Sequence, residues 1–150
     1  MEIVSGNAVS DFLARVTRRP ERYREVLVCT PFLDDVTVAA MRDMALLTPR
    51  VRCGFRLVTR AVAARMVLQR LPAPLQVWRQ TIRVRPRIHA KVYFALARAY
   101  RHSEAIITSA NLTLDGMTLN DELGIRFTGE TASGRSALAG LRSNIQKWIH

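Results

Sequence analysis

Three pairs of polar residues in the second half of the chain have the side-chain types and spacing needed for chemistry on a phosphate group. They are His89 and Lys91, Ser109 and Asn111, and Asn120 and Glu122. Each pair occupies positions i and i+2 of a strand-like segment, so both members lie on one face. Together they provide a nucleophile or acid–base, a fixed positive charge, hydrogen-bond donors and a carboxylate. We therefore expect the pairs to meet at one end of a sheet and to act on a phosphoryl group without a metal.

Each of these residues has a simpler interpretation when it is taken alone. A single histidine in a strand, such as His89, is more often structural than catalytic. Lys91 is typical of a strand lysine whose stem is buried and whose charge reaches water. Ser109 and Asn111 are common turn formers, and Glu122 is typical of a solvated charge at a strand end. The joint pattern, rather than any one residue, favours a site.

The elements that must position these residues follow from hydrophobic periodicity. Apolar runs predict strands at 25–32, 51–59, 88–96, 104–112 and 121–129, with one or two short strands within 74–86. Helical spacing predicts helices at 7–18, 34–47, 61–71 and 133–148. Early strand–helix alternation followed by clustered strands predicts an α/β fold, with a mixed β-sheet flanked by helices on both faces. The length of 150 residues favours a single domain, 1–150.

The charge of the chain indicates a polyanionic partner. There are 23 Lys and Arg residues against 12 Asp and Glu, a formal net charge of +11. Nucleic acid is the first candidate partner and an anionic membrane surface the second; an arginine-rich but ordinary surface is the alternative. The candidate phosphate contacts lead into the first polar pair and are Arg79, Arg83, Arg85 and Arg87. The same arginines would also suit an edge strand, where charge prevents unwanted pairing.

Nothing else in the sequence indicates a metal, a cofactor or a membrane span. Cys29 and Cys53 lie in apolar segments without zinc-site spacing, which predicts a buried, reduced pair in a cytoplasmic protein. Asp34 and Asp35 precede a predicted helix and are better explained as its N-cap than as metal ligands. The first residues lack the regions of a signal peptide, and no apolar run approaches the roughly 18 residues of a membrane span.

The motifs resemble those of the phospholipase D superfamily. HAK at 89–91, TSANLT at 108–113 and GMTLNDEL at 116–123 are similar to its His-x-Lys, (Gly/Ser)-Ser-x-Asn and downstream Asn-x-Glu pattern, the last being found in many nuclease-like members. The resemblance covers the C-terminal half by motif, and the combination is specific. Two positions depart from the pattern: Leu96 replaces the family aspartate five residues after the lysine, and Thr108 replaces a glycine.

The resemblance implies a metal-independent phosphodiesterase that forms a homodimer, because one chain has a single copy of a motif that the site needs twice. It implies that His89 attacks phosphorus to give a phosphohistidine, while the partner's His89 acts as acid and then base. Lys91 and Asn111 would hold the non-bridging oxygens. Ser109 would bind phosphate or position its neighbours, and Glu122 would accept a hydrogen bond from His89.

The substrate is expected to be DNA or RNA, cleaved by a nonspecific or structure-directed endonuclease, since no base-reading module is evident. One alternative is phosphatidyl transfer or lipid hydrolysis by the same residues, which would need an apolar groove for acyl chains or an interfacial helix. The other is a catalytically silent nucleic-acid-binding module, for which Leu96 is the sequence support.

Overall fold

The computed structural model describes residues 1–5, 7–70, 81–118 and 122–149. One sheet contains β1 (Glu2–Ser5), β2 (Tyr23–Cys29), β3 (Gly54–Thr59), β4 (Ile82–Val84), β5 (Val92–Ala97), β6 (Glu104–Thr108) and β7 (Leu123–Thr128). The α-helices described are α1 (Asn7–Arg18), α2 (Asp35–Leu47), α3 (Ala61–Gln69), α5 (Leu114–Thr118) and α6 (Ala132–Ile149). Short 3-10 helices occupy Pro20–Arg22, Thr48–Val51 and Tyr100–His102.

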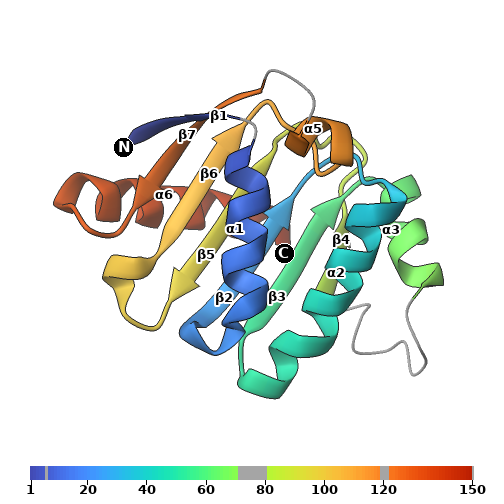
Figure 1. Ribbon diagram of the computed structural model, residues 1–150, viewed down its shortest axis with the longest axis horizontal. Coiled ribbons are helices and arrows are strands. Elements are labelled where there is room, and N and C mark those ends of the chain that lie inside the picture. The colour runs from blue at the N-terminus through green and yellow to red at the C-terminus, as the bar shows by residue number, and fades with distance from the viewer. Residues whose placement is uncertain (6, 71–80, 119–121, 150) are drawn as a thin grey trace.

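The strand order across the sheet is β1-β7-β6-β5-β2-β3-β4 (Figure 1). β2, β3 and β4 are parallel, whereas β5 pairs antiparallel with β2 and β6, and β7 pairs antiparallel with β6 and β1. Consequently, the carboxyl ends of β2, β3 and β6 meet the amino ends of β5 and β7 on one side. We call this side the motif edge; it is marked by Cys29, Thr59, Val92, Thr108 and Leu123.

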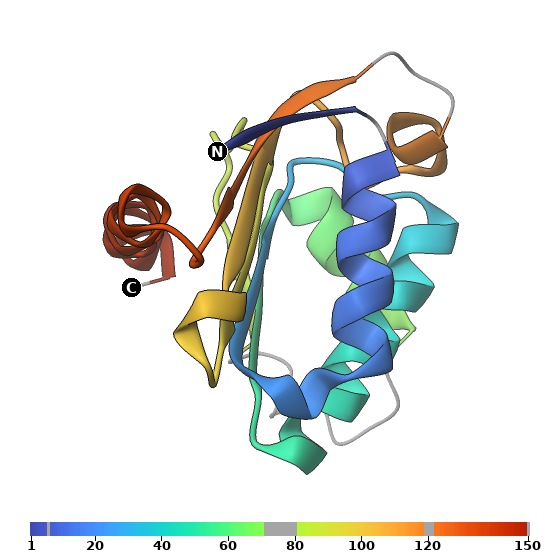
Figure 2. The same ribbon diagram turned by 60° about the vertical axis from the view of Figure 1, so that its left-hand side comes forward.

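Helices cover both faces of the sheet, as the apolar periodicity predicts. α1, α2 and α3 pack on one face and α6 packs on the other (Figure 2). The buried residues of α1 recur at helical spacing and are Val9, Phe12, Leu13 and Val16. Asp34 is the N-cap of α2, with its carboxylate accepting a hydrogen bond from the Thr37 amide at 2.9 Å. The predicted α/β fold, a mixed sheet with helices on both faces, is confirmed.

Side chains alternate between the two faces of the sheet along β5. Val92 and Phe94 belong to the cluster under α6, and Tyr93 belongs to the cluster under α1 and α2. Leu96 follows the same alternation and is buried under α6, so an apolar contact occupies the position where the resemblance leads one to expect an aspartate.

The three strands next to the motifs, β5, β6 and β7, are shorter than predicted. Their polar residues lie just outside the strands, in the adjoining loops. β5 begins at Val92, so His89 and Lys91 precede it, and β6 ends at Thr108, so Ser109 and Asn111 follow it. Apolar alternation continues past the last ladder hydrogen bonds, and for that reason periodicity alone overestimates the strands. β1 was not expected from the sequence; it pairs with β7 at one border of the sheet.

Candidate active site at the motif edge

The topology brings the predicted catalytic residues to one edge of the sheet. His89 and Lys91 lead into β5, Ser109 and Asn111 follow β6, and Glu122 immediately precedes β7. The amide of Thr108 donates to the carbonyl of Lys91 at 3.2 Å, which ties the first two segments together. Asn120, the other member of the third pair, lies outside the described residues.

Buried residues from β2, α2 and β5 hold the loop that contains Ser109 and Asn111. The Leu112 amide donates to Thr30 Oγ1 at 3.2 Å, and Thr37 Oγ1 donates to the Leu112 carbonyl at 2.7 Å. Tyr93 Oη donates to the Ala110 carbonyl at 3.2 Å. Burial raises the pKa of Tyr93 well above its usual value, so this phenol remains a neutral donor. The loop backbone is therefore fixed by long-range contacts rather than by the turn residues alone.

Asn111 has a close backbone neighbour and an unsatisfied side-chain atom. Its Oδ1 is buried and has no hydrogen-bond partner among the described residues. Gly116 of α5 packs directly against it, since a Cβ at position 116 would lie 2.7 Å from the Asn111 carbonyl oxygen. An unsatisfied buried polar atom is costly, so each instance in a folded protein needs a physical explanation, of which a functional role is one.

Ser109 and Glu122 are joined in the structure. The Ser109 hydroxyl donates to the Glu122 carboxylate, and Ser109 Oγ accepts a hydrogen bond from the Leu123 amide at 3.2 Å. The two segments thereby form one unit at the start of β7. The hydrogen bond expected between Glu122 and His89 is not present among the described contacts, because Ser109 contacts this carboxylate and Arg60 contacts the imidazole.

Arg60 is a site residue that belongs to none of the motifs in the sequence. Its Nη2 lies 3.1 Å from His89 Nε2 and 3.3 Å from His89 Nδ1, and its Nε donates to the Ile88 carbonyl at 3.2 Å. Because arginine only donates, the ring nitrogen that it contacts acts as an acceptor. Arg60 directly follows β3, so the rule that carboxyl ends of parallel strands gather at one edge could have identified it.

Lys91 is half-buried, and its ammonium forms no hydrogen bond or ion pair with any described residue. The carbonyl of its neighbour Ala90 accepts from the Cys29 thiol at 3.6 Å. Burial raises the pKa of Cys29 to about 12, which keeps this thiol protonated and unreactive at neutral pH. Cys29 and Cys53 are both free and buried. Cys29 is therefore neutral, whereas Lys91 has a positive charge that no described residue neutralises.

The four arginines proposed as phosphate contacts have different environments. Arg83 Nε donates to the Ile149 carbonyl and Arg85 Nε to the Trp148 carbonyl, each at 2.9 Å, so both cap the C-terminus of α6. Arg87 is exposed on the turn before Ile88, with no partner among the described residues. Arg79 lies outside the described residues. The structure therefore gives Arg83 and Arg85 a structural role that the sequence did not predict.

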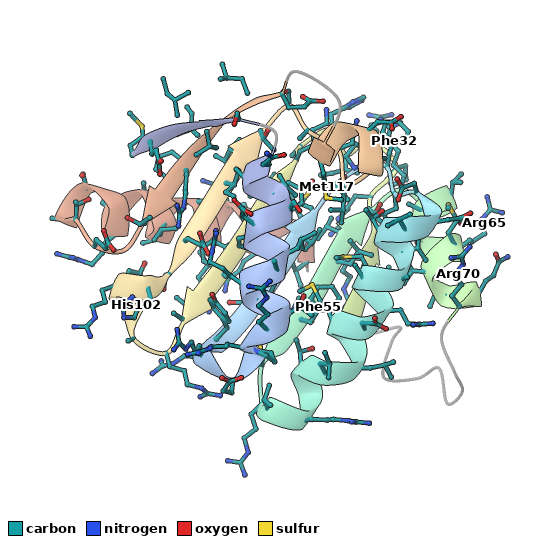
Figure 3. The ribbon with its side chains drawn as sticks, in the orientation of Figure 1. Phe32, Phe55, Arg65, Arg70, His102 and Met117 are labelled. Carbon is teal, nitrogen blue, oxygen red and sulfur yellow. The ribbon has the colours of Figure 1, made fainter. Side chains whose placement is uncertain are left out.

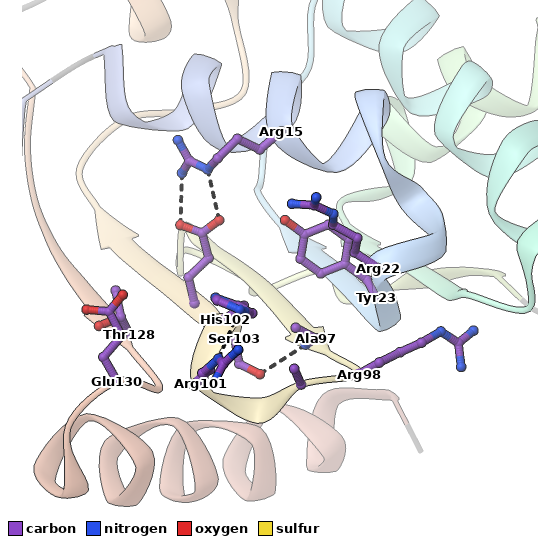
Figure 4. A pocket seen from close by; sticks show the side chains of 12 residues that line it. Arg15, Arg22, Tyr23, Ala97, Arg98, Arg101, His102, Ser103, Thr128 and Glu130 are labelled. Atoms are coloured by element: carbon purple, nitrogen blue, oxygen red, sulfur yellow. Dashed lines mark hydrogen bonds and ion pairs between the residues drawn. The ribbon is translucent and has the colours of Figure 1, made fainter.

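A cavity of about 480 Å³ lies at the opposite edge of the sheet (Figure 4). Buried Glu104 in its wall accepts two hydrogen bonds from Arg15, at 2.8 and 3.1 Å, and pairs with Arg126 at 3.0 Å. His102 also lines this cavity, far along the sheet from Phe32 (Figure 3). None of the predicted catalytic residues is among its described lining residues, so the cavity is separate from the candidate site.

Within the ranges that the structure describes, no three His, Cys, Asp or Glu side chains gather closely enough to hold a metal ion. None of the described helices is long and apolar enough to cross a bilayer.

Comparison with known proteins identifies the fold. No family model and no curated protein matches the sequence. Nuc from Salmonella typhimurium, a phospholipase D family member, matches with a TM-score of 0.56 and 12% identity, over 95% of this chain and 92% of that chain. NucT from Helicobacter pylori matches with a TM-score of 0.61 and 12% identity, over 99% and 94%. TrmBL2, an archaeal chromatin protein whose structure shows DNA binding, matches with a TM-score of 0.57 and 11% identity, over 98% of this chain and 50% of that chain. The chain therefore shares the fold of these three structures, as the resemblance of its motifs to the phospholipase D superfamily led us to expect.

Proposed function

We propose that this protein is a metal-independent phosphodiesterase that cleaves nucleic acid at a site shared by two subunits. The proposal rests on one observation: a single edge of the sheet holds an accessible imidazole, the unengaged ammonium of Lys91 and the side chain of Asn111. The fold that the chain shares with Nuc and NucT supports a phosphodiester substrate.

In the proposed mechanism, a ring nitrogen of His89 attacks phosphorus, forming a P–N bond as the bond to the leaving oxygen breaks. The partner's His89, protonated at this stage, gives its proton to the leaving oxygen. The same imidazole then takes a proton from water, whose oxygen attacks phosphorus and breaks the P–N bond. Two identical imidazoles in opposite protonation states predict a bell-shaped dependence of rate on pH.

The other residues of the site stabilise charge and geometry. Lys91 and Asn111 would bind the non-bridging oxygens, where negative charge increases in the transition state. A lysine suits a single oxygen in a confined space, because its ammonium is a compact charge, whereas the planar guanidinium of arginine needs a wider site. Glu122 would fix the orientation of Ser109, and an additional contact between Glu122 and His89 stays a prediction.

An exposed apolar row supports the homodimer. Ile3, Ile107 and Ile125 are register neighbours on β1, β6 and β7, and Leu123 lies two residues before Ile125 on the same face. Ile3 is 75% and Leu123 66% exposed. The row lies on the α6 side of the sheet, and its member Leu123 directly follows Glu122 at the motif edge. A second copy covering this row would bring a second motif close to the first, which the two-histidine mechanism requires.

Nucleic acid is the proposed substrate because the formal net charge is +11. The charge comes mainly from arginines, which bind phosphate oxygens through paired N–H groups.

The test is cleavage of labelled single- and double-stranded DNA and RNA by purified protein in EDTA. We expect cleavage in the chelator, and loss of at least about 10³-fold in rate for His89→Ala, since the nucleophile and the general acid would be removed together. His102→Ala, which changes an exposed histidine at the far edge of the sheet, is the matched control and should cleave like the wild type. Strict dependence on added Mg²⁺, or turnover of lipid phosphodiesters alone, would contradict the proposal.

A further inference from the structure

We propose that Phe32 and Arg60 form a base-stacking subsite beside His89, so that the preferred substrate is single-stranded nucleic acid with an unpaired base next to the cleaved phosphate. This inference rests on the proposed function, and it specifies which form of nucleic acid the site accepts.

Phe32 is a large aromatic residue that the fold leaves in solvent. It lies in the segment between β2 and α2 at the motif edge (Figure 3) and is 49% exposed. Thr30 Oγ1 donates a hydrogen bond to the Phe32 carbonyl at 3.0 Å, which holds the backbone at this position. An exposed ring on an ordered segment is a surface on which a planar group can stack with little loss of conformational entropy.

Arg60 connects this ring to the predicted nucleophile. Its guanidinium carbon lies 5.0 Å from the Phe32 ring centroid, and its Nη2 lies 3.1 Å from His89 Nε2. A cation in this position can bind the phosphate that His89 attacks while it remains stacked on the ring. Arg60 thus lies between Phe32 and His89. A base stacked on Phe32 would therefore be next to the phosphate that His89 attacks.

A small apolar cavity continues from the ring. It has a volume of about 210 Å³ and is lined by Phe32, Arg60 and aliphatic residues that include Leu33, Val62 and Met66. The volume is below the roughly 300–1,000 Å³ of sites that enclose drug-sized ligands. A single ring system fits such a space better than a pair of acyl chains. An apolar wall, an aromatic ring and one cation are the features that bind a nucleobase by its face.

The form of the nucleic acid follows from this geometry. A base inside a duplex is paired and stacked on its neighbours, so its face is unavailable until energy has been spent on flipping it out. A base in a single strand or at a frayed end has a free face. In the proposed dimer, the partner's Phe32 would serve the base on the other side of the same phosphate.

The experiment measures binding, not cleavage, on the His89→Ala background. Single-stranded oligonucleotides just long enough to span the site are compared with versions of the same length that lack one internal base. We expect loss of the base, and separately Phe32→Ala, to weaken binding by about 5- to 100-fold, the range of one base–aromatic stack. Phe32→Ala and loss of the base together should weaken binding no more than either change alone, because both remove the same contact. Phe32→Trp should restore affinity.

Val36→Ala is the matched control, since Val36 is similarly exposed, at 58%, and does not line the cavity. Its affinity should match that of the parent, and duplex affinity should change less than about twofold in Phe32→Ala. Equal losses on single strands and duplexes, or additive effects of base removal and Phe32→Ala, would overturn the subsite. If the protein binds neutral phospholipid vesicles more tightly than oligonucleotides, and Phe32→Ala weakens the vesicle binding, the ring is a lipid contact instead. If the protein cleaves nucleic acid in EDTA but Phe32→Ala does not change the affinity for single strands, this inference is rejected and the proposed function is retained.

Discussion

At the scale of single residues, the candidate site depends on a glycine as much as on charged groups. Gly116 of α5 lies against the backbone of Asn111, where a Cβ would be 2.7 Å from the carbonyl oxygen and 3.2 Å from the amide nitrogen. No side chain larger than hydrogen fits unless Asn111 moves. The glycine therefore positions an amide that the mechanism places on a phosphate oxygen.

Gly116→Ala should lower the turnover number by about 10- to 100-fold, because a displacement of the order of 1 Å in a positioning residue is enough for such a loss. The measurement is steady-state cleavage of a single-stranded oligonucleotide, with thermal unfolding recorded to confirm that the fold is kept. Gly140→Ala is the control: a Cβ there meets nothing within 4 Å, so activity should be unchanged, and stability should rise by about 0.5–1 kcal/mol in a helix interior. Wild-type turnover in Gly116→Ala would contradict the role given to this glycine.

At the scale of elements, the position of the α6 C-terminus explains why Arg83 and Arg85 have a different role from Arg87. Arg83 and Arg85, on and after β4, donate to the last carbonyls of α6, whose C-terminus is negative because of its unpaired carbonyl groups. Arg87, two residues further, lies beyond the helix end and faces solvent. A run of alternating arginines that looks uniform in the sequence is thus divided by the position of one helix.

Arg87→Ala and Arg85→Ala should separate the two roles. Arg87→Ala should weaken nucleic-acid binding and make the log–log salt slope less steep by about 1, from a wild-type value near −5 if about six phosphates are contacted. Arg85→Ala should leave that slope unchanged and lower the free energy of unfolding by about 0.5–1.5 kcal/mol, the usual contribution of one hydrogen bond. Salt titrations of affinity and urea unfolding of both variants measure these effects. An altered slope in Arg85→Ala alone would reverse the assignment.

At the scale of the whole molecule, the uncovered part of the sheet is the feature that a monomer leaves unexplained. α6 covers the strands in the middle of the sheet and leaves the apolar row on β1, β6 and β7 in solvent. An exposed sheet face of this kind is a liability unless another chain covers it. Because one member of the row, Leu123, lies at the motif edge, a second copy of this protein covering the row would lie close to the candidate site.

Ile125→Asp should dissociate the proposed dimer and abolish cleavage together, because burying an unpaired carboxylate at the interface is unfavourable. Ile125 is 40% exposed, so the subunit itself should still fold. Sedimentation equilibrium gives the mass, and cleavage in EDTA gives the activity. Val36→Asp, on the opposite face, should remain dimeric and active. A wild-type protein that is monomeric and active at micromolar concentration would exclude the shared site.

The sequence by itself determined the α/β class, the positions of most elements and the group of polar residues at the candidate site. These features depend on local patterns: apolar residues alternate along strands and recur every three to four residues along helices. The spacing of His89 and Lys91, and of Ser109 and Asn111, is likewise a local pattern. Once sequence placed these pairs beside successive strands, their meeting at one edge followed from the topology.

Only the tertiary structure decided which side chains contact one another. Arg60 and His89 are 29 residues apart, and Arg85 and Trp148 are 63 apart; no periodicity connects them. The structure pairs Glu122 with Ser109 where the sequence suggested His89, and places Phe32 beside the site although it belongs to no motif. Such contacts depend on how strands are ordered in the sheet and where helix ends fall, because a hydrogen bond needs donor and acceptor within about 3 Å. Local patterning does not determine positions to that accuracy.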